Sequence, residues 1–187
     1  VIGLPSIHND YWDPFFKQID ALDMTICLHI GGGNPAPHAS METPIEAWIS
    51  TMPMTIAYAA SDWLQLEALH KYPDMRIALS EGSIGWVHYF TERADFSNSR
   101  HKYWTHSRFQ DMKPSEVFKR QIYASFWFER TSLSLLEQYP DNIMFETDFP
   151  HPTCLYPDPL AHAADVLAHL GERRRGTTES RRCRAQN

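Results

Sequence analysis

Four short apolar runs of the sequence each end at or near a polar side chain. These residues are His29 after TICL, Glu81 after IALS, Ser125 within IYASFWF and Asp148 after IMFET. If the runs are parallel strands, their carboxyl ends meet at one edge of a sheet, which is where α/β folds bind ligands. An imidazole and two carboxylates gathered there could hold a divalent metal ion and transfer protons.

His29 stands in LHIGGG, at the end of an apolar run and before three glycines. A neutral imidazole at a strand end suits Zn²⁺ or Mn²⁺, so we treat His29 as a candidate metal ligand. A histidine packed beside a glycine turn explains the same residues equally well, and both interpretations stay open. The glycines resemble a phosphate loop, but Ala36 replaces the third glycine of GxGxxG and Pro35 precedes it, so the indication of a nucleotide site is weak.

Asp148 stands in FETDFPHP, where Glu146 and His151 crowd the same strand end. Aspartate is common as a cap of turns. A carboxylate in this setting could also hold a metal ion and accept a proton from metal-bound water. We therefore select Asp148 as a metal ligand and catalytic residue. Glu146 lies two residues earlier and should point to the same side if the strand continues.

Glu81 stands in LSEGSIGW, directly before Gly82 and a helix that we expect to begin near residues 83–84. As a charge at the N-terminus of that helix, it would stabilise the helix dipole. As a catalytic residue, it would be a general acid or base that faces the metal ion. We select Glu81 as the second catalytic residue.

Four aromatic or imidazole side chains are predicted to line the mouth of the site and contact the substrate. They are His8, Trp12, Trp86 and His151. The tryptophans are explained first by packing and only second by stacking on a substrate. The sequence has no GxSxG motif, so a serine nucleophile of that kind is not expected.

The elements that must position these residues alternate along the chain. Strands are predicted over residues 24–29, 76–79, 122–126 and 143–145, each largely apolar on both faces, as in parallel strands that helices cover. Proline after Asp13 and after Asp158 predicts helix starts there, and TPIE at residues 43–46 predicts a capping box. This alternation predicts an α/β fold with a parallel sheet.

Composition narrows the class of protein. The 187 residues include 23 acidic and 17 basic groups, a formal net charge of −6, which argues against a general binder of nucleic acid or membranes. Three cysteines without CxxC spacing favour a reduced, cytoplasmic setting. Residues 1–170 form the predicted domain. Residues 171–187, with six basic and two acidic groups, are predicted to be a disordered basic tail.

Five motifs, in this order, resemble the amidohydrolase-related family, which includes aminocarboxymuconate-semialdehyde decarboxylase and related aromatic-acid decarboxylases. They are LPSIHNDYWDPFF, ICLHIGGG, IALSEGSIGWVHYFTERAD, YASFWFER and NIMFETDFPHP. The resemblance implies a partial (β/α)₈ barrel of TIM type, with about the last four βα units present and the N-terminal half missing. It also implies that His29 and Asp148 bind the metal ion. Glu81 falls where decarboxylases of the family often have a catalytic histidine.

The resemblance further implies an incomplete site. Family members supply two more ligands from an HxH or ExH motif on the first strand, and no such motif ends a predicted strand here. A metal ion held by His29 and Asp148 alone would be two ligands short of a tetrahedral set. The length agrees, since 187 residues fall below the roughly 250 of such barrels. We therefore expect a fragment, whose open sheet edges favour a homo-oligomer.

The resemblance thus predicts a metal-dependent amidohydrolase-type enzyme that uses Zn²⁺ or Mn²⁺. Its substrate would be a small carboxylated molecule, aromatic or ring-derived, that the enzyme hydrolyses or decarboxylates without oxidation. Neither nucleic acid nor a membrane is expected as a partner. The alternative is a catalytically incomplete half-barrel with only a structural or binding role.

Overall fold

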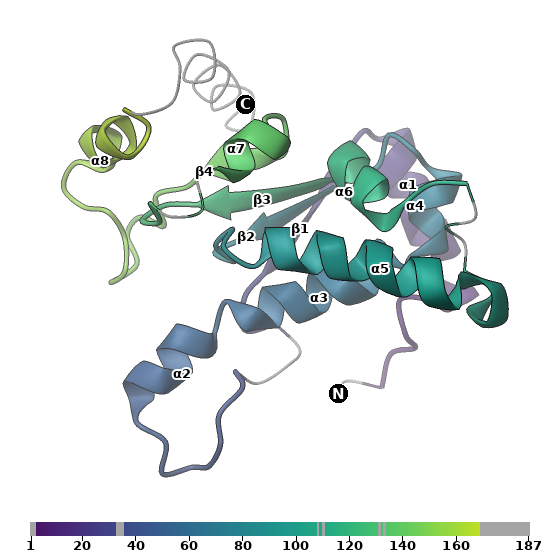
Figure 1. Ribbon diagram of the computed structural model, residues 1–187, viewed down its shortest axis with the longest axis horizontal. Helices are drawn as coiled ribbons and strands as arrows, with labels where there is room; N and C mark the ends of the chain where they lie inside the picture. The colour runs from purple at the N-terminus through teal and green to yellow at the C-terminus, as the bar shows by residue number, and fades with distance from the viewer. Residues whose placement is uncertain are drawn as a thin grey trace.

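The structure of the chain, a computed structural model, describes residues 3–32, 36–107, 109, 111–130, 132 and 134–168, so the predicted tail at 171–187 lies outside the described residues. Helices and strands alternate along the chain (Figure 1). They are, in order, the 3₁₀ helix η1 (Asp10–Trp12), α1 (Asp13–Ala21), β1 (Thr25–His29), α2 (Ile45–Thr51), α3 (Met54–Leu64), α4 (Glu67–Lys71), β2 (Arg76–Ser80), α5 (Val87–Thr105), α6 (Pro114–Gln121), β3 (Ile122–Phe126), α7 (Leu135–Gln138), β4 (Ile143–Phe145) and α8 (Pro159–Val166). None of these described helices is both long and apolar enough to cross a membrane.

Four parallel strands form one sheet in the order β1-β2-β3-β4. The register places Cys27 beside Ala78 and Ser125 beside Met144. The predicted strands are confirmed to within one residue, and so is the α/β class with a parallel sheet. Because each strand returns to the same direction through helices, the four carboxyl ends lie at one edge of the sheet.

The two faces of the sheet differ in composition. One, which we call the helix face, is apolar and part of the buried core, and it includes Ile77, Leu79, Ile122, Ala124 and Phe126. The other, which we call the site face, carries Thr25, Cys27, His29, Ala78, Ser80, Tyr123, Ser125 and Met144. β1 alternates strictly between exposed and half-buried positions. The prediction that helices cover each strand on both faces is therefore wrong for β1.

The predicted helix starts are confirmed in place, but only one has the expected cap. Asp158 caps α8 by accepting a hydrogen bond from the Ala161 amide at 3.0 Å. Pro14 lies in the first turn of α1, where the sequence pattern predicts Asp13 as the N-cap, but the N-cap is Trp12 and no side chain caps the helix. The capping box predicted before α2 is wrong, since that helix has no side-chain cap. The Thr43 hydroxyl instead accepts a hydrogen bond from the Ser40 amide at 3.1 Å.

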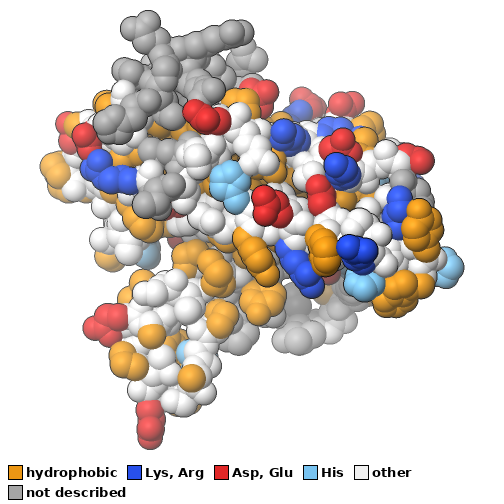
Figure 2. Space-filling view, viewed as in Figure 1, with side chains coloured by type: hydrophobic (Ala, Val, Ile, Leu, Met, Phe, Trp, Pro, Cys, Tyr) orange, Lys and Arg blue, Asp and Glu red, His pale blue; other side chains and the backbone are white. Residues whose placement is uncertain are grey.

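Residues 37–52 form a lobe, containing α2, that projects from the rest of the protein (Figures 1 and 2). The lobe is held by its own contacts. The His38 and Trp48 rings stack with centroids 3.5 Å apart, and the Thr51 hydroxyl donates to the Pro37 carbonyl oxygen at 2.7 Å. No residue of α2 is buried. The lobe therefore contributes little to the core around the sheet.

Gly82 brings the loop that follows β2 into close contact with α3. A Cβ atom on this residue would lie 2.2 Å from Cγ2 of Ile56, which is a fully buried core residue. Since interiors are close-packed, a side chain at this position forces the core to move. The close approach of the loop to α3 therefore requires glycine.

We expect Gly82→Ala to lower the free energy of unfolding by about 2 kcal/mol, because Ile56 must shift to admit the methyl group. Gly85→Ala is the matched control, since its Cβ would meet only the movable hydroxyl of Ser132 at 3.1 Å. The control should change stability by less than about 0.5 kcal/mol. Denaturant unfolding followed by circular dichroism measures both variants, and equal stabilities would show that the contact with Ile56 is no constraint.

Candidate functional site

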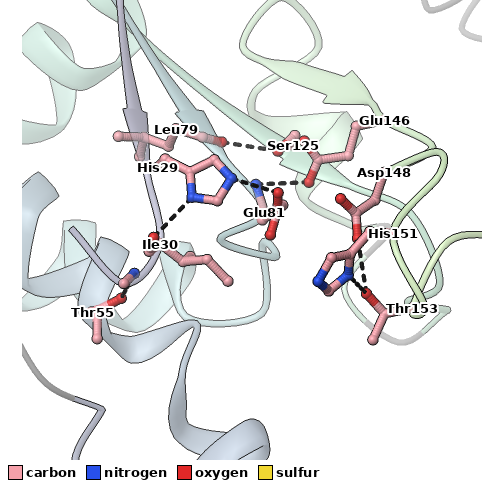
Figure 3. A network of polar contacts seen from close by, with 11 residues as sticks. His29, Ile30, Thr55, Leu79, Glu81, Ser125, Glu146, Asp148, His151 and Thr153 are labelled. Atoms are coloured by element: carbon pink, nitrogen blue, oxygen red, sulfur yellow. Dashed lines mark hydrogen bonds and ion pairs between the residues drawn. The ribbon is translucent and has the colours of Figure 1, made fainter.

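Three of the predicted site residues lie at the carboxyl ends of the strands. His29 is the last residue of β1, Glu81 directly follows β2, and Asp148 follows β4 after two intervening residues. Figure 3 shows Glu81 between His29 on one side and Asp148 with His151 on the other. We call the space between these side chains the mouth. The structure brings the imidazole and the two carboxylates together, while their chemical roles stay predictions.

The His29 imidazole has a defined orientation. Its Nδ1 lies 2.8 Å from the Ile30 carbonyl oxygen, which can only accept, so Nδ1 carries a hydrogen. Nε2 lies 2.6 Å from Oε1 of Glu81. The Ile30 carbonyl, together with the Glu81 and Asp148 carboxylates, raises the pKa of His29, although partial burial opposes the shift. An imidazole whose Nδ1–H binds a backbone carbonyl presents Nε2 as metal-ligating histidines do.

Glu81 is positioned by its own backbone. Its φ of +57° lies in the left-handed region, and its amide donates to Oε1 of Glu146 at 2.8 Å. The interpretation of Glu81 as an N-terminal helix charge is wrong, because α5 begins at Val87 and has no acidic residue in its first turn. Ser83, with a φ of +54°, cannot begin a helix at the predicted place.

Glu146 is the carboxylate that accepts the Glu81 amide hydrogen. β4 ends one residue earlier, as predicted, so the alternation of a strand does not set the relative directions of Glu146 and Asp148. Burial raises the pKa of Glu146 to about 7, and the Glu81 and Asp148 carboxylates add to the rise. Hydrogen bonds from Ser125 and from the Glu81 amide oppose it. Glu146 therefore keeps its proton up to near-neutral pH in the folded protein.

Asp148 is held by two side chains of the loop that follows it. Its Oδ2 accepts a hydrogen bond from the Thr153 hydroxyl at 2.8 Å and lies 3.1 Å from Nδ1 of His151. The alternative of a turn cap does not describe this carboxylate, because the turn is closed by the His151 amide donating to the Asp148 carbonyl. The Asp148 side chain is only 9% exposed, whereas that of His151 is 58% exposed.

Several residues around the mouth have a left-handed, strained backbone conformation. Glu81, Ser83 and Asp148 all have φ between +54° and +57°. Each such residue costs on the order of 1 kcal/mol when it is not glycine, and strain of this kind is found where a site must be preorganised. In the loops after β2 and β4, the fold therefore holds the backbone of the carboxylate residues in conformations that an unfolded chain rarely adopts.

Glu129 is a residue of the site that the sequence interpretation missed. Its Oε1 accepts a hydrogen bond from the Ile84 amide at 2.8 Å, and its Oε2 accepts one from the Trp127 amide at 3.1 Å. Glu129 thereby ties the loop after β2 to the loop after β3. Its sequence signal is an acidic residue just beyond an apolar strand, which is the pattern that identified Asp148.

Two of the predicted substrate-binding residues lie away from the mouth. Nε2 of His8 is 2.9 Å from Oδ1 of Asp62, and the Trp12 indole donates to the Pro5 carbonyl oxygen at 3.1 Å. Asp62 lies near the C-terminal end of α3. The N-terminal end of α3 is the one near the mouth, because the Thr55 hydroxyl there accepts a hydrogen bond from the Gly31 amide in the loop after β1. Asp62 is seven residues further on, about 10 Å along the helix. This placement corrects the expectation that His8 and Trp12 line the mouth.

The other two predicted substrate-binding residues belong to loops at the carboxyl ends of the strands. The Trp86 indole donates to the Gly82 carbonyl oxygen at 2.9 Å and packs on Phe90 with ring centroids 5.3 Å apart, as the packing interpretation expects. His151 lies at the mouth (Figure 3). A groove of about 620 Å³ between α3 and α5 contains none of the predicted site residues in its lining.

The donor types at the mouth suit a divalent metal ion, but their number is small. Nε2 of His29 and the Asp148 carboxylate are typical ligands of Zn²⁺ and Mn²⁺. Within the described residues, no three His, Cys, Asp or Glu side chains are grouped so that they could hold an ion. β1, which ends at His29, and β4, which precedes Asp148, are the outer strands of the described sheet. The residues therefore fit part of a metal site.

A family model described as amidohydrolase matches residues 1–181 of the sequence. The match covers the predicted domain and continues into the basic tail. No curated protein sequence matches the chain significantly.

Solved structures share the fold over most of this chain. A 5-carboxyvanillate decarboxylase from Sphingomonas paucimobilis is 17% identical with a TM-score of 0.68, over 93% of this chain and 52% of its own. An amidohydrolase from Mycobacterium avium subsp. paratuberculosis is 14% identical with a TM-score of 0.72, over 92% and 44%. A dihydroxybenzoic acid decarboxylase from Polaromonas sp., solved with manganese and the inhibitor 2-nitroresorcinol, is 21% identical with a TM-score of 0.61, over 94% and 53%.

The chain thus spans about half the length of each of these proteins. Its four parallel strands and their helices are part of a (β/α)₈ barrel, which confirms the predicted fold class.

The burial of Glu146 should appear in the pH dependence of stability, measured in EDTA. Burial raises the pKa of Glu146 from 4.5 to about 7. Its contribution to the free energy of unfolding is therefore fully present below about pH 4.5 and is lost as the pH rises through 7. Glu146→Gln keeps an oxygen for the Glu81 amide and removes the titration. We expect the variant to gain about 2 kcal/mol relative to the parent between pH 5 and pH 8.

Thermal and denaturant unfolding at each pH measure this difference. Glu46→Gln, a change at an exposed position of α2, is the matched control and should leave the curve of the parent unchanged. Parallel curves for the parent and Glu146→Gln would contradict the prediction.

Proposed function

The chain belongs to the amidohydrolase family, and from that premise we propose that it forms part of the mouth of a metal-dependent enzyme. The substrate class is a small carboxylated molecule, aromatic or ring-derived, and the reaction is non-oxidative decarboxylation in preference to hydrolysis. The observation that carries the proposal is the convergence of His29, Glu81 and Asp148 at the carboxyl ends of parallel strands. In barrels of this type, the carboxyl ends of the strands are where substrates bind.

Relatives in fold favour decarboxylation over hydrolysis. Two of them are named as decarboxylases of aromatic acids, 5-carboxyvanillate and dihydroxybenzoic acid, and one of these holds manganese. We extend this reaction class to the present chain as part of the proposal. The mouth supports it, because carboxyl groups beside an imidazole can act as general acids and supply the proton that replaces CO₂ on the substrate.

His29 and Asp148 are the proposed ligands of Zn²⁺ or Mn²⁺. The ion, when bound, would act as a Lewis acid that polarises an oxygen of the substrate. His29 can offer its Nε2 lone pair only after that nitrogen has lost its proton. Oε1 of Glu81, 2.6 Å away, is the nearest acceptor.

In the proposed step, Glu81 acts as the general acid. Its proton passes to the ring carbon that bears the carboxylate, the bond from that carbon to the carboxylate breaks, and the electron pair of this bond returns to the ring as CO₂ leaves. Glu81 ends the step as a carboxylate. Asp148, which Thr153 and His151 hold in place, is the second proposed proton carrier. The exposed His151 imidazole, when protonated, suits the carboxylate of a substrate.

A structural or binding role for an incomplete half-barrel is the second candidate function. The observation that favours it is the small donor set, since the described residues contain no group of three metal-ligating side chains. The two functions differ in whether His29 and Asp148 bind metal at all.

Loss of either proposed ligand should weaken metal binding. We expect His29→Ala and Asp148→Ala each to lower the affinity for Mn²⁺ and Zn²⁺ by at least about 100-fold. Mutation of a residue that only hydrogen-bonds a metal ligand typically lowers metal affinity about 10- to 100-fold, and loss of the ligand itself should cost more. Isothermal titration calorimetry measures the affinities. His101→Ala, which removes an exposed imidazole from α5, should bind as the parent does. Equal affinities in all three variants would support the structural alternative.

Glu81→Gln keeps the size of the side chain and removes the acid. We expect the rate of CO₂ release from a hydroxybenzoic acid to fall by at least about 100-fold, because Glu81 would supply the proton. Metal affinity, measured in parallel, should change by less than about tenfold. Glu46→Gln on the projecting lobe is the control, and a rate for Glu81→Gln equal to that of the control would remove Glu81 from the catalytic residues.

A further inference from the structure

We propose that Glu129 is a positioning residue, which sets the place of the Glu81 carboxylate at the mouth. It does so by holding the far end of residues 81–86, which follow β2 and which we call the Glu81 turn. Both hydrogen bonds of Glu129 go to backbone amides, so it acts through Glu81 and not on a substrate. This placement is a property of the fold, whereas its effect on the reaction rate rests on the proposed function.

The Glu81 turn is held by a carboxylate at each end. The Glu81 amide donates to Oε1 of Glu146 at 2.8 Å. The Ile84 amide donates to Oε1 of Glu129, also at 2.8 Å. Glu146 follows β4 and Glu129 follows β3, so the two ends are attached to different strands. Since β2 and β3 are the inner strands of the described sheet, the contact made by Glu129 lies between elements that have strand neighbours on both sides.

The backbone between these two ends is strained. Glu81 and Ser83 have φ of +57° and +54°, a conformation that is costly for residues other than glycine. Gly82, which lies between them, packs closely against the core. Such backbone persists only where the surrounding contacts hold it. The hydrogen bond from the Ile84 amide to Glu129 is the contact that does so at the far end of the turn.

The two contacts of Glu129 require two acceptor atoms. Its Oε1 accepts the hydrogen of the Ile84 amide, and its Oε2 accepts that of the Trp127 amide at 3.1 Å. A backbone amide can only donate, so a glutamine, which has one acceptor atom, could hold only one of the two. Trp127 is buried and directly follows β3, so its amide fixes Glu129 to the end of that strand. Glu129 therefore links the Glu81 turn to the sheet.

The place of the Glu81 carboxylate is narrowly defined at the mouth. Its Oε1 lies 2.6 Å from Nε2 of His29, and only 18% of the Glu81 side chain is exposed (Figure 3). Relaxation of the left-handed φ of Glu81 would turn its side chain away from this place. A general acid must lie within hydrogen-bond reach of the atom that it protonates, and a misplacement of about 1 Å can lower a rate about 100-fold. Loss of Glu129 should therefore lower the rate through Glu81.

Amide hydrogen exchange, measured by NMR in metal-free protein, tests the placement without any activity. We expect Glu129→Ala to raise the exchange rates of the Ile84 and Glu81 amides by at least about tenfold, because the hydrogen bond that restrains the turn is lost. Glu129→Gln should produce the same changes to a smaller extent, and it replaces Glu129→Ala if that variant does not fold. Unchanged exchange at Glu81 would overturn the proposal.

Asp95→Ala is the matched control. Asp95 is also a half-buried carboxylate that accepts two hydrogen bonds, from the Ser115 amide at 2.9 Å and the Ser115 hydroxyl at 2.7 Å, and it links α5 to the start of α6. The control should lower the free energy of unfolding as Glu129→Ala does, but leave the exchange rate at Glu81 within about twofold of the parent. An equal rise at Glu81 in the control would indicate general loosening and would overturn the proposal.

The rate of CO₂ release from 2,6-dihydroxybenzoate with Mn²⁺ tests the effect on the reaction. We expect Glu129→Ala to lower kcat by at least about tenfold and to change KM by less than about threefold, because a general acid acts in the chemical step. In a chain that already carries Glu81→Gln, the same substitution should lower kcat by less than about twofold, since its effect passes through Glu81. Equal falls in both chains would indicate a merely structural role and would overturn the proposal.

The two measurements separate this inference from the proposed function. If the parent neither releases CO₂ nor binds Mn²⁺, the proposed function fails, and the exchange rate at Glu81 still decides whether Glu129 positions that residue. If Glu81→Gln lowers kcat and Glu129→Ala does not, the proposed function stands and the inference is overturned. If both substitutions lower kcat and their effects are not additive, both are supported.

Discussion

The parallel backbone ladder of β1 to β4 determines where the candidate site residues of this protein lie. Because the strands share one direction, their carboxyl ends fall at one edge and the residues that follow them face a common space. The ladder is held in turn by the helix face, where alternate apolar side chains are fully buried. Burial of those side chains fixes the sheet, and the sheet brings an imidazole together with several carboxylates that would otherwise repel one another.

Carboxylates also shape the loops around the mouth. Glu146 and Glu129 accept hydrogen bonds from amides of the loop after β2, in the stretch where Glu81 and Ser83 have left-handed backbone. These hydrogen bonds to the loop amides can offset part of the cost of such backbone. The Ile30 carbonyl and the negative charge of Glu81 and Asp148 raise the pKa of His29, and negative charge at the mouth favours the approach of cations.

Much of this architecture could be predicted because its signals are local. Apolar runs end in polar residues at the strand ends, and Pro14 and Pro159 mark the first turns of α1 and α8. The convergence of the site residues then follows from the parallel order of the strands. The late start of α5 and the position of His8 could not be predicted, because they depend on contacts with Glu129 and Asp62. Those partners are 45 and 54 residues away in the sequence.

The projecting lobe at residues 37–52 does not depend on the strand ladder for its structure. Its ring stack and its hydroxyl hydrogen bond close it on itself, and α2 contributes no buried residue. Insertion, shortening or exchange of this segment would leave the strand ladder intact. Because the lobe follows the carboxyl end of β1, such changes would alter what surrounds the mouth. Changes in this segment are therefore expected to cost little folding stability, as is usual for surface loops.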